Sequence, residues 1–303
     1  MNLKLNSWRL LGALTALVMV AACGSTPTPA TSKGTITVAG FNFPESSILA
    51  DIYGQALAHD GYTVSYKLNL GTRPIVTTAI KAGQVDLYPG YAASELEFFN
   101  KGAGEATSDA AATTAKLNTY LQPLGLVALT PAPAMDANAF AVPQAIADKY
   151  HLTKLSDLTP IAGQLVFGAG PECPTYKFCL PGLESVYGLH FKAVKTLDTD
   201  GQLTRAAFKN GSIQVGLVFT TDPDLKSLGL VVLEDDKHLT AADNVVPIAR
   251  QAVATAEVKA VLNSIDAKLT TPDLIALIDK VANQHLDAEA VATGWLQQHN
   301  YSS

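Results

Sequence analysis

Apolar and polar positions in the first third of the chain follow an alternating order of strands and helices. Residues 35–39 and 62–70 alternate between apolar and polar side chains, and residues 85–88 form a short apolar run, so all three segments are predicted strands. Between them, apolar residues recur at helical spacing after Pro44 and after Pro74, and a proline in the first turn is typical of a helix start. This order predicts a sheet that starts parallel and has helices on both faces.

The third predicted strand runs into Pro89-Gly90, and a helix is predicted from about residue 92 to residue 100. Proline removes a ladder donor and glycine permits a sharp bend, so the strand is expected to stop at Pro89. Ligands of open α/β sheets bind at the carboxyl ends of strands. Tyr91 is therefore predicted at the mouth of a binding site, with Ser94 one turn further on. Taken alone, Tyr91 is better explained as a half-buried aromatic residue at a strand end, and only the rest of the chain favours the binding site.

The rest of the chain repeats this order once and then returns. A Pro-rich break at residues 130–134 predicts a crossing into a second strand–helix set, in which a strand ends in Phe219-Thr220 much as the earlier strand ends in Tyr91. A later strand and three helices, between residues 244 and 298, are predicted to rejoin the first set. The pattern predicts an α/β clamshell with two hinge crossings, in which each lobe is a mixed, mostly parallel sheet flanked by helices around a shared ligand cleft. Lobe I is expected to comprise residues 34–134 plus 244–303, and lobe II residues 135–243.

The beginning of the chain has the features of an export signal. Lys4 and Arg9 precede an apolar segment at residues 10–20 that is too short to span a bilayer. The small residues before Cys23 resemble the lipobox of bacterial lipoproteins, in which the cysteine receives a lipid; an ordinary signal peptide with an incidental cysteine is the alternative. We therefore expect a signal peptide at residues 1–22, a flexible Pro/Thr/Ser-rich tether at residues 23–33, and a protein anchored on the extracytoplasmic face of the cell membrane.

Composition and motifs exclude several classes of protein. Hydrophobic residues make up 48% of the chain and charged residues 16%, a globular balance, and the net charge of −6 comes without a basic patch for nucleic acid. Neither a catalytic-triad order nor a Walker A or H-E-x-x-H motif occurs, so we expect neither an enzyme nor a cofactor. Cys173 and Cys179, six residues apart, are predicted to form a disulfide in an oxidising compartment; a metal site is the weaker alternative, because no histidine is near.

Short segments spread over the chain resemble one family when they are taken together. They are residues 44–46, 67–73, 86–91, 165–168, 182–189, 220–222 and 233–237. In this order they are similar to the glycine betaine/carnitine/choline substrate-binding proteins of osmoprotectant ABC importers, which have the periplasmic-binding-protein type II fold. The resemblance covers nearly all of the chain beyond the signal.

The resemblance implies a ligand site. In that family a quaternary ammonium lies among aromatic faces, and a ligand carboxylate meets basic or polar groups. By position, Tyr91 and Phe219 match cage aromatics and Ser94 matches a polar residue, whereas Asn138 and Asp243 replace cage tyrosines. Phe41 and Tyr176 stand where basic residues can occur, and Gly90 replaces a common glutamate. Phe41 and Tyr176 could complete an aromatic wall, and Asp243 could face a cation. The expected ligand-binding set is Tyr91, Ser94, Phe219, Phe41, Asn138, Tyr176, Asp243 and Thr220.

The implied function is transport. We expect a monomeric solute-binding lipoprotein that captures a quaternary-amine osmolyte and delivers it to an ABC permease and its ATPase. Because half of the aromatic cage is substituted, a polyol, a sugar or a phenolic compound stays open as the ligand. An exported enzyme on the same fold and a surface sensor or adhesin are further alternatives. The absence of a nucleophile–base pair argues against the first, and the absence of a fused signalling domain argues against the second.

Overall fold

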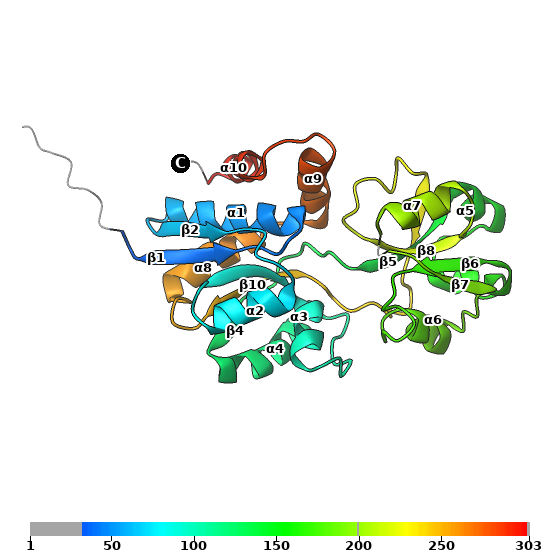
Figure 1. Ribbon diagram of the computed structural model, residues 1–303, viewed down its shortest axis with the longest axis horizontal. Helices are drawn as coiled ribbons and strands as arrows, with labels where there is room; N and C mark the ends of the chain where they lie inside the picture. Colours follow the sequence, from blue (N-terminus) through cyan, green and yellow to red (C-terminus); the bar gives the residue numbers. More distant parts are fainter. Residues whose placement is uncertain (1–31, 199, 302–303) are drawn as a thin grey trace, which may run out of the picture. The chain divides into compact units, whose positions relative to one another are not determined.

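The computed structural model describes residues 32–198 and 200–301, so the signal segment, most of the tether and the predicted lipid site at Cys23 lie outside the described residues. Within the described ranges, none of the helices combines the length and the hydrophobicity that crossing a bilayer requires. The strands form two separate five-stranded sheets (Figure 1).

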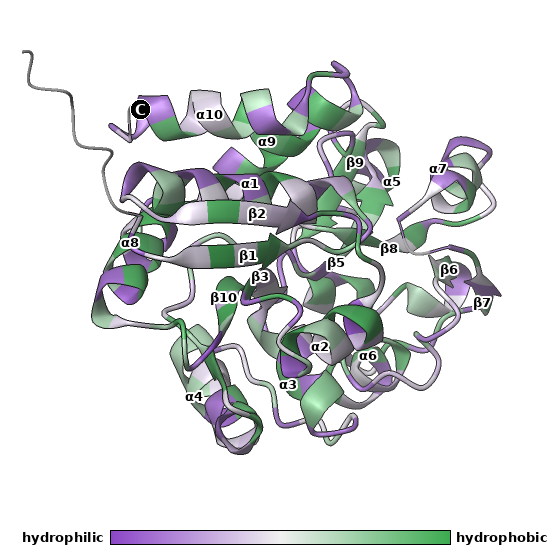
Figure 2. Ribbon diagram, turned by 60° about the vertical axis from the view of Figure 1, so that its left-hand side comes forward, coloured by the Kyte–Doolittle hydropathy of each residue, from purple (hydrophilic) through white to green (hydrophobic). Residues whose placement is uncertain are grey.

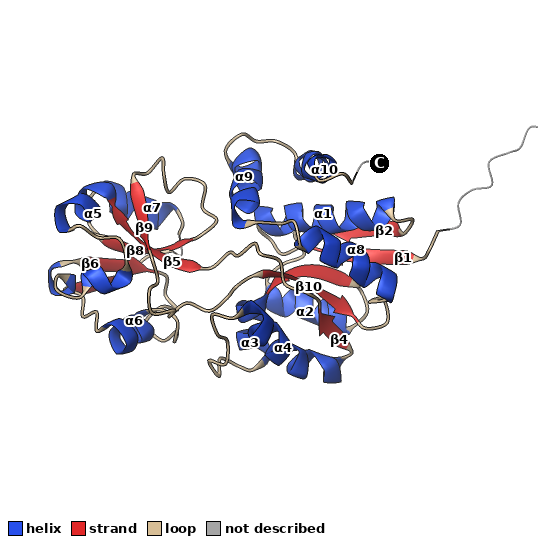
Figure 3. Cartoon of the chain, turned by 180° about the vertical axis from the view of Figure 1, so that it is seen from behind, coloured by secondary structure: helices blue, strands red, loops and turns tan. Residues whose placement is uncertain are grey.

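The first sheet has the strand order β2-β1-β3-β10-β4. Its strands are β1 (Thr35–Ala39), β2 (Thr63–Lys67), β3 (Leu87–Tyr91), β4 (Leu126–Ala128) and β10 (Val245–Arg250). The helices are α1 (Pro44–His59), α8 (Ala256–Asp266), α9 (Thr271–Ala282) and α10 (Ala288–Gln298) on one side, and α2 (Arg73–Lys81), α3 (Ala92–Phe99) and α4 (Ala110–Leu121) on the other. Figure 3 shows these helices around the sheet.

The second sheet has the order β7-β6-β8-β5-β9 and is built from residues that follow one another in sequence. Its strands are β5 (Asn138–Pro143), β6 (Val166–Ala169), β7 (Ala193–Thr196), β8 (Val215–Phe219) and β9 (Leu230–Leu233). Its helices are α5 (Gln144–Tyr150), α6 (Leu180–Tyr187) and α7 (Gln202–Lys209). Three short 3-10 helices, Gln122–Leu124, Leu155–Leu158 and Ala162–Gln164, occur in the connections.

Both sheets are mixed, as predicted, but less parallel than the sequence pattern indicated. In the first sheet β1 pairs in parallel with β2 and β3, whereas β10 pairs antiparallel with β3 and β4. In the second sheet β6 pairs in parallel with β7 and β8, whereas β5 pairs antiparallel with β8 and β9. The antiparallel pairings arise because the strand that follows each crossing, β5 or β10, enters the middle of its sheet in the opposite direction.

The third strand does not stop at Pro89, contrary to the expectation from the sequence. It continues through Gly90 to Tyr91, and Pro89 lies opposite Pro247 of β10. The amide of Arg250 donates to the carbonyl of Asp86, so the alternation of the antiparallel ladder makes the two prolines a non-hydrogen-bonded pair. Neither proline therefore removes a bond between these strands, and the strand carries Tyr91 to the end of the sheet.

Two crossing segments join the sheets and run beside each other. The amide of Asp136 donates to the carbonyl of Asp243 at 3.2 Å, and the amide of Val245 donates to the carbonyl of Ala134 at 3.0 Å. An antiparallel bridge between Met135 and Asn244 lies between these bonds. The crossings thus form a short two-stranded link, and residues on both of its strands are near the ends of β3 and β8.

Each sheet has its own buried core. One cluster fills the first sheet and its helices, and two others cover the opposite faces of the second sheet. The colouring of α4 and α8 in Figure 2 alternates between hydrophobic and hydrophilic, as expected for helices with one face on a sheet and one in water. Phe178 and Ala241, which belong to the second half of the fold by sequence, are buried in the cluster of the first sheet.

Candidate functional site

A cavity of about 620 Å³ lies where β3 and β8 end and β5 begins. Both sheets and both crossing segments contribute to its wall. The lining residues are Phe43, Arg73, Tyr91, Ala93, Ser94, Glu97, Phe98, Asp136, Ala137, Asn138, Glu172, Tyr176, Phe178, Phe219, Thr240, Ala241 and Asp243. We call this the ligand cavity.

Aromatic side chains from both sheets form much of this wall. Tyr91 ends β3 and is 4% exposed, and its hydroxyl donates to Oε1 of Glu45 at 2.5 Å. The ring of Phe43 has its centroid 6.1 Å from that of Tyr91 and is 37% exposed. Phe219 ends β8 on the other side, and Tyr176 comes from the loop before α6. The edges and faces of these rings give the cavity a largely apolar surface.

The carboxylate of Asp243 is held by Ser94. Its two oxygens accept hydrogen bonds from the amide of Ser94 at 2.9 Å and from the hydroxyl of Ser94 at 2.6 Å. Burial raises the pKa of Asp243, while these hydrogen bonds and the positive charge of Arg73 act in the opposite direction. The second crossing is thereby fixed to the first turn of α3.

Arg73 and Glu95 form a second charged contact at the cavity. Nε of Arg73 lies 2.8 Å from Oε1 of Glu95, whose side chain is fully buried, and the hydroxyl of Tyr88 donates to the other carboxylate oxygen at 3.1 Å. Burial acts to lower the pKa of Arg73, but the Glu95 carboxylate outweighs it and the pKa is raised. A Cβ atom at Gly90 would lie 2.8 Å from Ile248 and 3.1 Å from Cγ of Glu95, so Glu95 occupies the space beside Gly90.

Two acids, Glu45 and Asp136, lie beside the aromatic wall, and Asp136 itself lines the ligand cavity. Burial raises the pKa of Glu45 to about 7, although the hydrogen bond from Tyr91 acts to lower it. The pKa of Asp136 is raised as well, first by burial and then by the negative charge of Glu45. Asp136 also accepts a hydrogen bond from the hydroxyl of Thr221 at 2.8 Å. This pair therefore retains protons that carboxyl groups in water would release.

A second cavity of about 630 Å³ shares Phe43, Asp136 and Phe219 with the ligand cavity. Arg205 pairs there with both Asp222 and Asp224. Nδ2 of Asn283, at the end of α9, donates to Asp224 at 2.9 Å, so this contact joins the two halves of the fold. Burial raises the pKa of Asp200, beside this group, to about 7.

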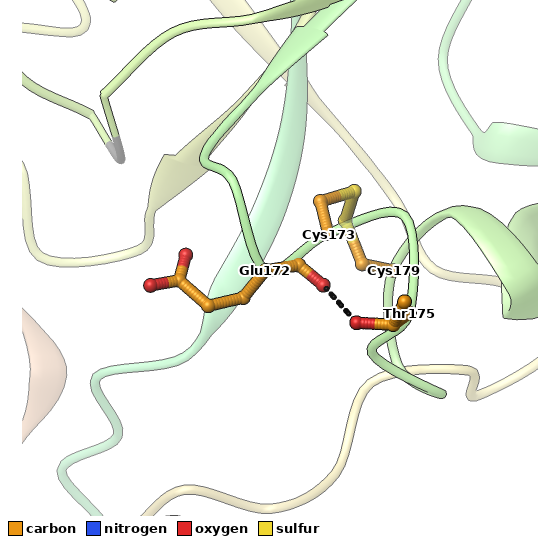
Figure 4. Close-up of a disulfide and its surroundings, with 4 residues drawn as sticks. All are labelled: Glu172, Cys173, Thr175 and Cys179. Carbon is orange, nitrogen blue, oxygen red and sulfur yellow. Dashed lines mark hydrogen bonds between the residues drawn. A yellow bond between two sulfur atoms is a disulfide. The ribbon is translucent and has the colours of Figure 1, made fainter.

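A disulfide shapes the loop that carries Glu172 and Tyr176. The structure joins the sulfur atoms of Cys173 and Cys179, and the hydroxyl of Thr175 donates to the Glu172 carbonyl at 3.2 Å (Figure 4). The Glu172 side chain points away from the disulfide in this view. Nζ of Lys177 donates to the carbonyl of Gly104 at 2.7 Å, which ties the loop to the connection between α3 and α4.

Most of the residues predicted from the sequence to bind the ligand meet at the ligand cavity, but two do not. Tyr91, Ser94, Asn138, Tyr176, Phe219 and Asp243 line it. Phe41 is 3% exposed and packs edge-on against Tyr88, because β1 directs it into the core behind the wall. Thr220 is turned toward the first crossing, where its hydroxyl donates to the Met135 carbonyl and accepts from the Ala137 amide. Neither residue lines the ligand cavity.

Several lining residues were not predicted from the sequence: Phe43, Arg73, Asp136 and Glu172. Phe43 lies two residues after Phe41, beyond the end of β1, and strand alternation alone would place both rings on the same side, so the sequence pattern did not separate the core ring from the cavity ring. The run Gly71-Thr72-Arg73-Pro74 could have predicted Arg73 as a lining residue, because ligands bind where a helix starts after the end of a strand. Asp136 and Glu172 lie in loops, and hydrophobic periodicity does not place loop residues.

Comparison with known proteins identifies the family. Residues 34–298 match the family described as the substrate binding domain of ABC-type glycine betaine transport systems. The chain belongs to this family. Glycine betaine-binding protein YehZ of Escherichia coli strain K12 is 29% identical over 300 residues, which cover 95% of this chain and 97% of that protein. The carnitine transport binding protein OpuCC of Listeria monocytogenes is 24% identical over 311 residues, covering 95% and 94%.

Solved structures agree on the fold of this family member. A crystal structure of a glycine betaine/carnitine/choline ABC transporter protein superposes with a TM-score of 0.77 at 21% identity, over 88% of this chain and 99% of that one. Apo YehZ from Escherichia coli gives a TM-score of 0.72 at 27% identity over the same shares. The predicted two-lobed, periplasmic-binding-protein type II fold is confirmed. The family consists of substrate-binding domains of transport systems and is not a family of enzymes.

Proposed function

We propose that this substrate-binding protein captures a small quaternary amine between its two lobes and delivers it to an ABC permease and its ATPase. The observation that carries the proposal is the ligand cavity itself, because aromatic faces from both lobes line it together with carboxylates. Tyr91 belongs to one lobe and Phe219 to the other, so one ligand can touch both only when the lobes are close. Such a ligand stabilises the closed arrangement through its contacts with both sides.

The charges at the cavity favour a cation. Among the lining residues, one positive side chain, Arg73, stands against three acids, Glu97, Glu172 and Asp243, and a fourth acid, Asp136, has a pKa raised well above its ordinary value. A cleft with an excess of one sign of charge attracts ligands of the opposite sign. A quaternary ammonium has no N–H donors to satisfy, and aromatic faces attract its charge by about 2 kcal/mol where water is excluded. The named ligands of the relatives, glycine betaine and carnitine, are both of this chemical class.

Isothermal titration calorimetry with the soluble protein tests this function. The panel contains glycine betaine, carnitine and choline, together with a polyol, a sugar and a phenolic compound as the alternative ligand classes. We expect at least one quaternary amine to bind and the other classes to give no heat of binding. Binding of a polyol, sugar or phenolic compound without any quaternary amine would replace this ligand assignment.

We further propose that the protein works outside the cytoplasm as a monomer, held to the membrane by a lipid on Cys23. The support is the sequence before Cys23, with its charged start, its apolar segment and the small residues at positions 20–22. Mass spectrometry of the protein from membranes should find a diacylglyceryl group on Cys23, and Cys23→Ala should release the protein from the membrane fraction. An unmodified Cys23 in the mature wild-type protein contradicts this assignment.

A further inference from the structure

A third cavity, of about 500 Å³, lies outside the ligand cavity and shares only Phe43 with it. Its wall comes from α1, β2 and the segment where α9 ends and α10 begins, and α10 packs along α1 (Figure 1). Three acids line it, Asp51, Asp287 and Glu289, whereas none of the lining residues is basic. None of the three forms a salt bridge with a residue that the structure describes. We call this the acidic cavity.

Asp51 is the acid at this cavity that the rest of the fold leaves without a partner. It lies in the middle of α1 and is 4% exposed, and within the described ranges its carboxyl group has no hydrogen-bond donor. Burial raises its pKa to about 6, and the negative charges of Glu289 and Asp287 act in the same direction. Helix capping accounts for Asp287, which accepts from the Ala290 amide at 3.0 Å, but Asp51 has no such role. A buried acceptor without a donor is unfavourable.

Two hydroxyl groups beside Asp51 also lack partners in the described part of the chain. Ser47, one turn earlier on the same face of α1, is 6% exposed, and its hydroxyl has no hydrogen-bond partner there. Tyr66 reaches from β2 onto α1, where a Cβ atom at Gly54 would overlap its ring. The pKa of Tyr66 is raised to about 12, first by burial and then by the charge of Asp51. Oxygen acceptors thus surround one end of the acidic cavity.

The packing of α10 on α1 fixes the acid on the other helix. The carbonyl of Glu289 accepts hydrogen bonds from Nε2 of Gln55 at 3.1 Å and from the hydroxyl of Thr293 at 2.8 Å. The hydroxyl of Thr293 also lies 2.9 Å from Oε1 of Gln55. These bonds tie the first turn of α10 to α1, so the charges of Asp51 and Glu289 are held near each other without a cation between them.

The chemistry of the acidic cavity selects its ligand. Three carboxyl groups call for more than one positive charge, and the unpartnered oxygens of Asp51, Ser47 and Tyr66 call for N–H donors. A quaternary amine has no such donors, whereas a primary ammonium group has three. The exposed part of the Phe43 ring and the ring of Tyr66 supply apolar surface for the carbon chain between two ammonium groups.

We propose that the acidic cavity is a second binding site, separate from the ligand cavity, for a small organic cation with two primary ammonium groups. One ammonium group donates to Asp51, and the other lies at Asp287 and Glu289. The diamine differs from the quaternary amine of the ligand cavity in that it is held by hydrogen bonds to carboxylates. The inference does not rest on the proposed function, because the two cavities have different acids and different elements in their walls.

Calorimetry of the soluble protein with 1,4-diaminobutane at pH 7.5 tests the site. We expect the diamine to bind, Asp51→Asn to weaken it by tenfold or more, and Glu289→Gln to weaken it by at least threefold. Glu289 is exposed, so its variant tests recognition even if Asp51→Asn impairs folding. The fully N-methylated analogue keeps both charges but has no N–H donors. Asp51→Asn should therefore change binding of this analogue by less than threefold.

The pH dependence of diamine binding gives a second readout. With a pKa of about 6, about one-tenth of Asp51 is ionised at pH 5, so the affinity should be about tenfold lower there than at pH 7.5. Alkylammonium groups have pKa values of about 10.4, so the diamine keeps its charges over this range. The other titratable groups that line the cavity are Asp287, Glu289 and Tyr66, and α9 adds only apolar Val281. In Asp51→Asn most of the pH dependence should disappear.

Two control variants separate this site from general charge and from the ligand cavity. Glu184→Gln removes one negative charge from an exposed position on α6 that lines none of the three cavities. Phe219→Ala alters the ligand cavity but not the acidic cavity. Both variants should bind the diamine within threefold of the wild-type affinity.

The outcomes are decisive in each case. A wild-type protein that gives no heat of binding with the diamine contradicts the inference. If the diamine binds but neither Asp51→Asn nor Glu289→Gln weakens it, the cation lies elsewhere and the inference is wrong. A loss in Glu184→Gln equal to that in Asp51→Asn would assign the effect to net charge. A tenfold loss in Phe219→Ala would place the diamine in the ligand cavity, which also overturns the inference.

Discussion

The hydroxyl of Tyr91 donates a hydrogen bond to Glu45 across 2.5 Å, and this contact joins the end of β3 to the first turn of α1. Both side chains are buried, at 4% and 5% exposed. The bond holds the Tyr91 ring at the wall of the ligand cavity. It also supplies a hydrogen-bond donor to the carboxyl group of Glu45, which has little access to water. The orientation of the ring and the charge of the acid therefore depend on each other.

Tyr91→Phe should separate these two roles. The ring remains, so affinity for the quaternary amine should change by less than about threefold. Glu45 loses its donor, so the free energy of unfolding should fall by about 1–3 kcal/mol at pH 8, where the carboxyl group is ionised, and by less at pH 5.5. Urea denaturation at the two pH values measures this, with Tyr62→Phe as the control, because the hydroxyl of half-buried Tyr62 reaches only an exposed carboxylate, Glu257, at 3.4 Å. An equal loss at both pH values would mean that the bond does not act on the ionised form.

Stability should fall as the pH rises through the range set by Glu45. Its pKa is about 7 in the folded protein against an ordinary value of 4.5, so between these values the folded state binds a proton that the unfolded chain has released. The contribution is complete below pH 4.5 and lost by pH 7, with a slope of about 1.4 kcal/mol per pH unit between them. Asp51 and Asp200, with pKa values raised to about 6 and about 7, add slopes of the same sign.

The variant Glu45→Gln isolates this contribution because it keeps an oxygen acceptor for Tyr91 and cannot titrate. The difference between wild-type and variant free energies of unfolding, measured from pH 4.5 to pH 8 by urea denaturation, should fall with rising pH over the window between the two pKa values. A difference that is independent of pH would show that Glu45 has the same pKa in the folded and unfolded states.

Phe219 and Phe41 should behave differently when each is changed to alanine. Phe219 is half-buried and lines both cavities, so Phe219→Ala should weaken ligand binding by about ten- to thirtyfold, the loss of one aromatic face. Phe41 is core, so Phe41→Ala should lower the free energy of unfolding by about 3–5 kcal/mol. Calorimetry and urea denaturation on both variants provide the comparison. If Phe219→Ala binds the ligand with wild-type affinity, the end of β8 is not part of the ligand site.

The disulfide should matter more for binding than for overall stability. It closes a loop with a sequence separation of 6, and so short a closure contributes about 2 kcal/mol to the free energy of unfolding. The double variant Cys173→Ser/Cys179→Ser should fold and bind the ligand more weakly, since Tyr176 and Glu172 are then less restricted. Thiol titration of the denatured, unreduced wild-type protein, lipidated at Cys23, should find neither Cys173 nor Cys179 free. Two reactive thiols would contradict the pairing.

The sequence predicted the α/β order and the two-lobed architecture because both follow from the spacing of apolar residues. It also brought Tyr91 and Phe219 to equivalent strand ends, since each comes directly after a clear apolar run. The predicted stop at Pro89 was wrong because strand partners are not visible in one sequence. Only the partner, with Pro247 opposite Pro89, shows that the missing donor removes no bond.

The finer features of the site depend on side-chain direction and on loops. Phe41 and Phe43 are two residues apart on a segment that leaves β1, and no local pattern states which ring enters the core. The bond between Asp243 and Ser94 links residues 149 positions apart, so its effect on the charge of Asp243 could not be read from the neighbours of either residue. Arg73 stands in a run that the sequence analysis noted, but its ion pair with Glu95 became apparent only in the structure.

The position of β10 in the first sheet has a consequence for the order in which the protein is assembled. The second sheet uses strands that are consecutive in the chain, from β5 to β9, whereas the first sheet needs β10, which follows all of them. During synthesis from the N-terminus, β3 and β4 therefore remain without the strand that lies between them until residue 250 has been added. We expect the inserted half to fold first, and the half that begins the chain to be completed last by its closing segment.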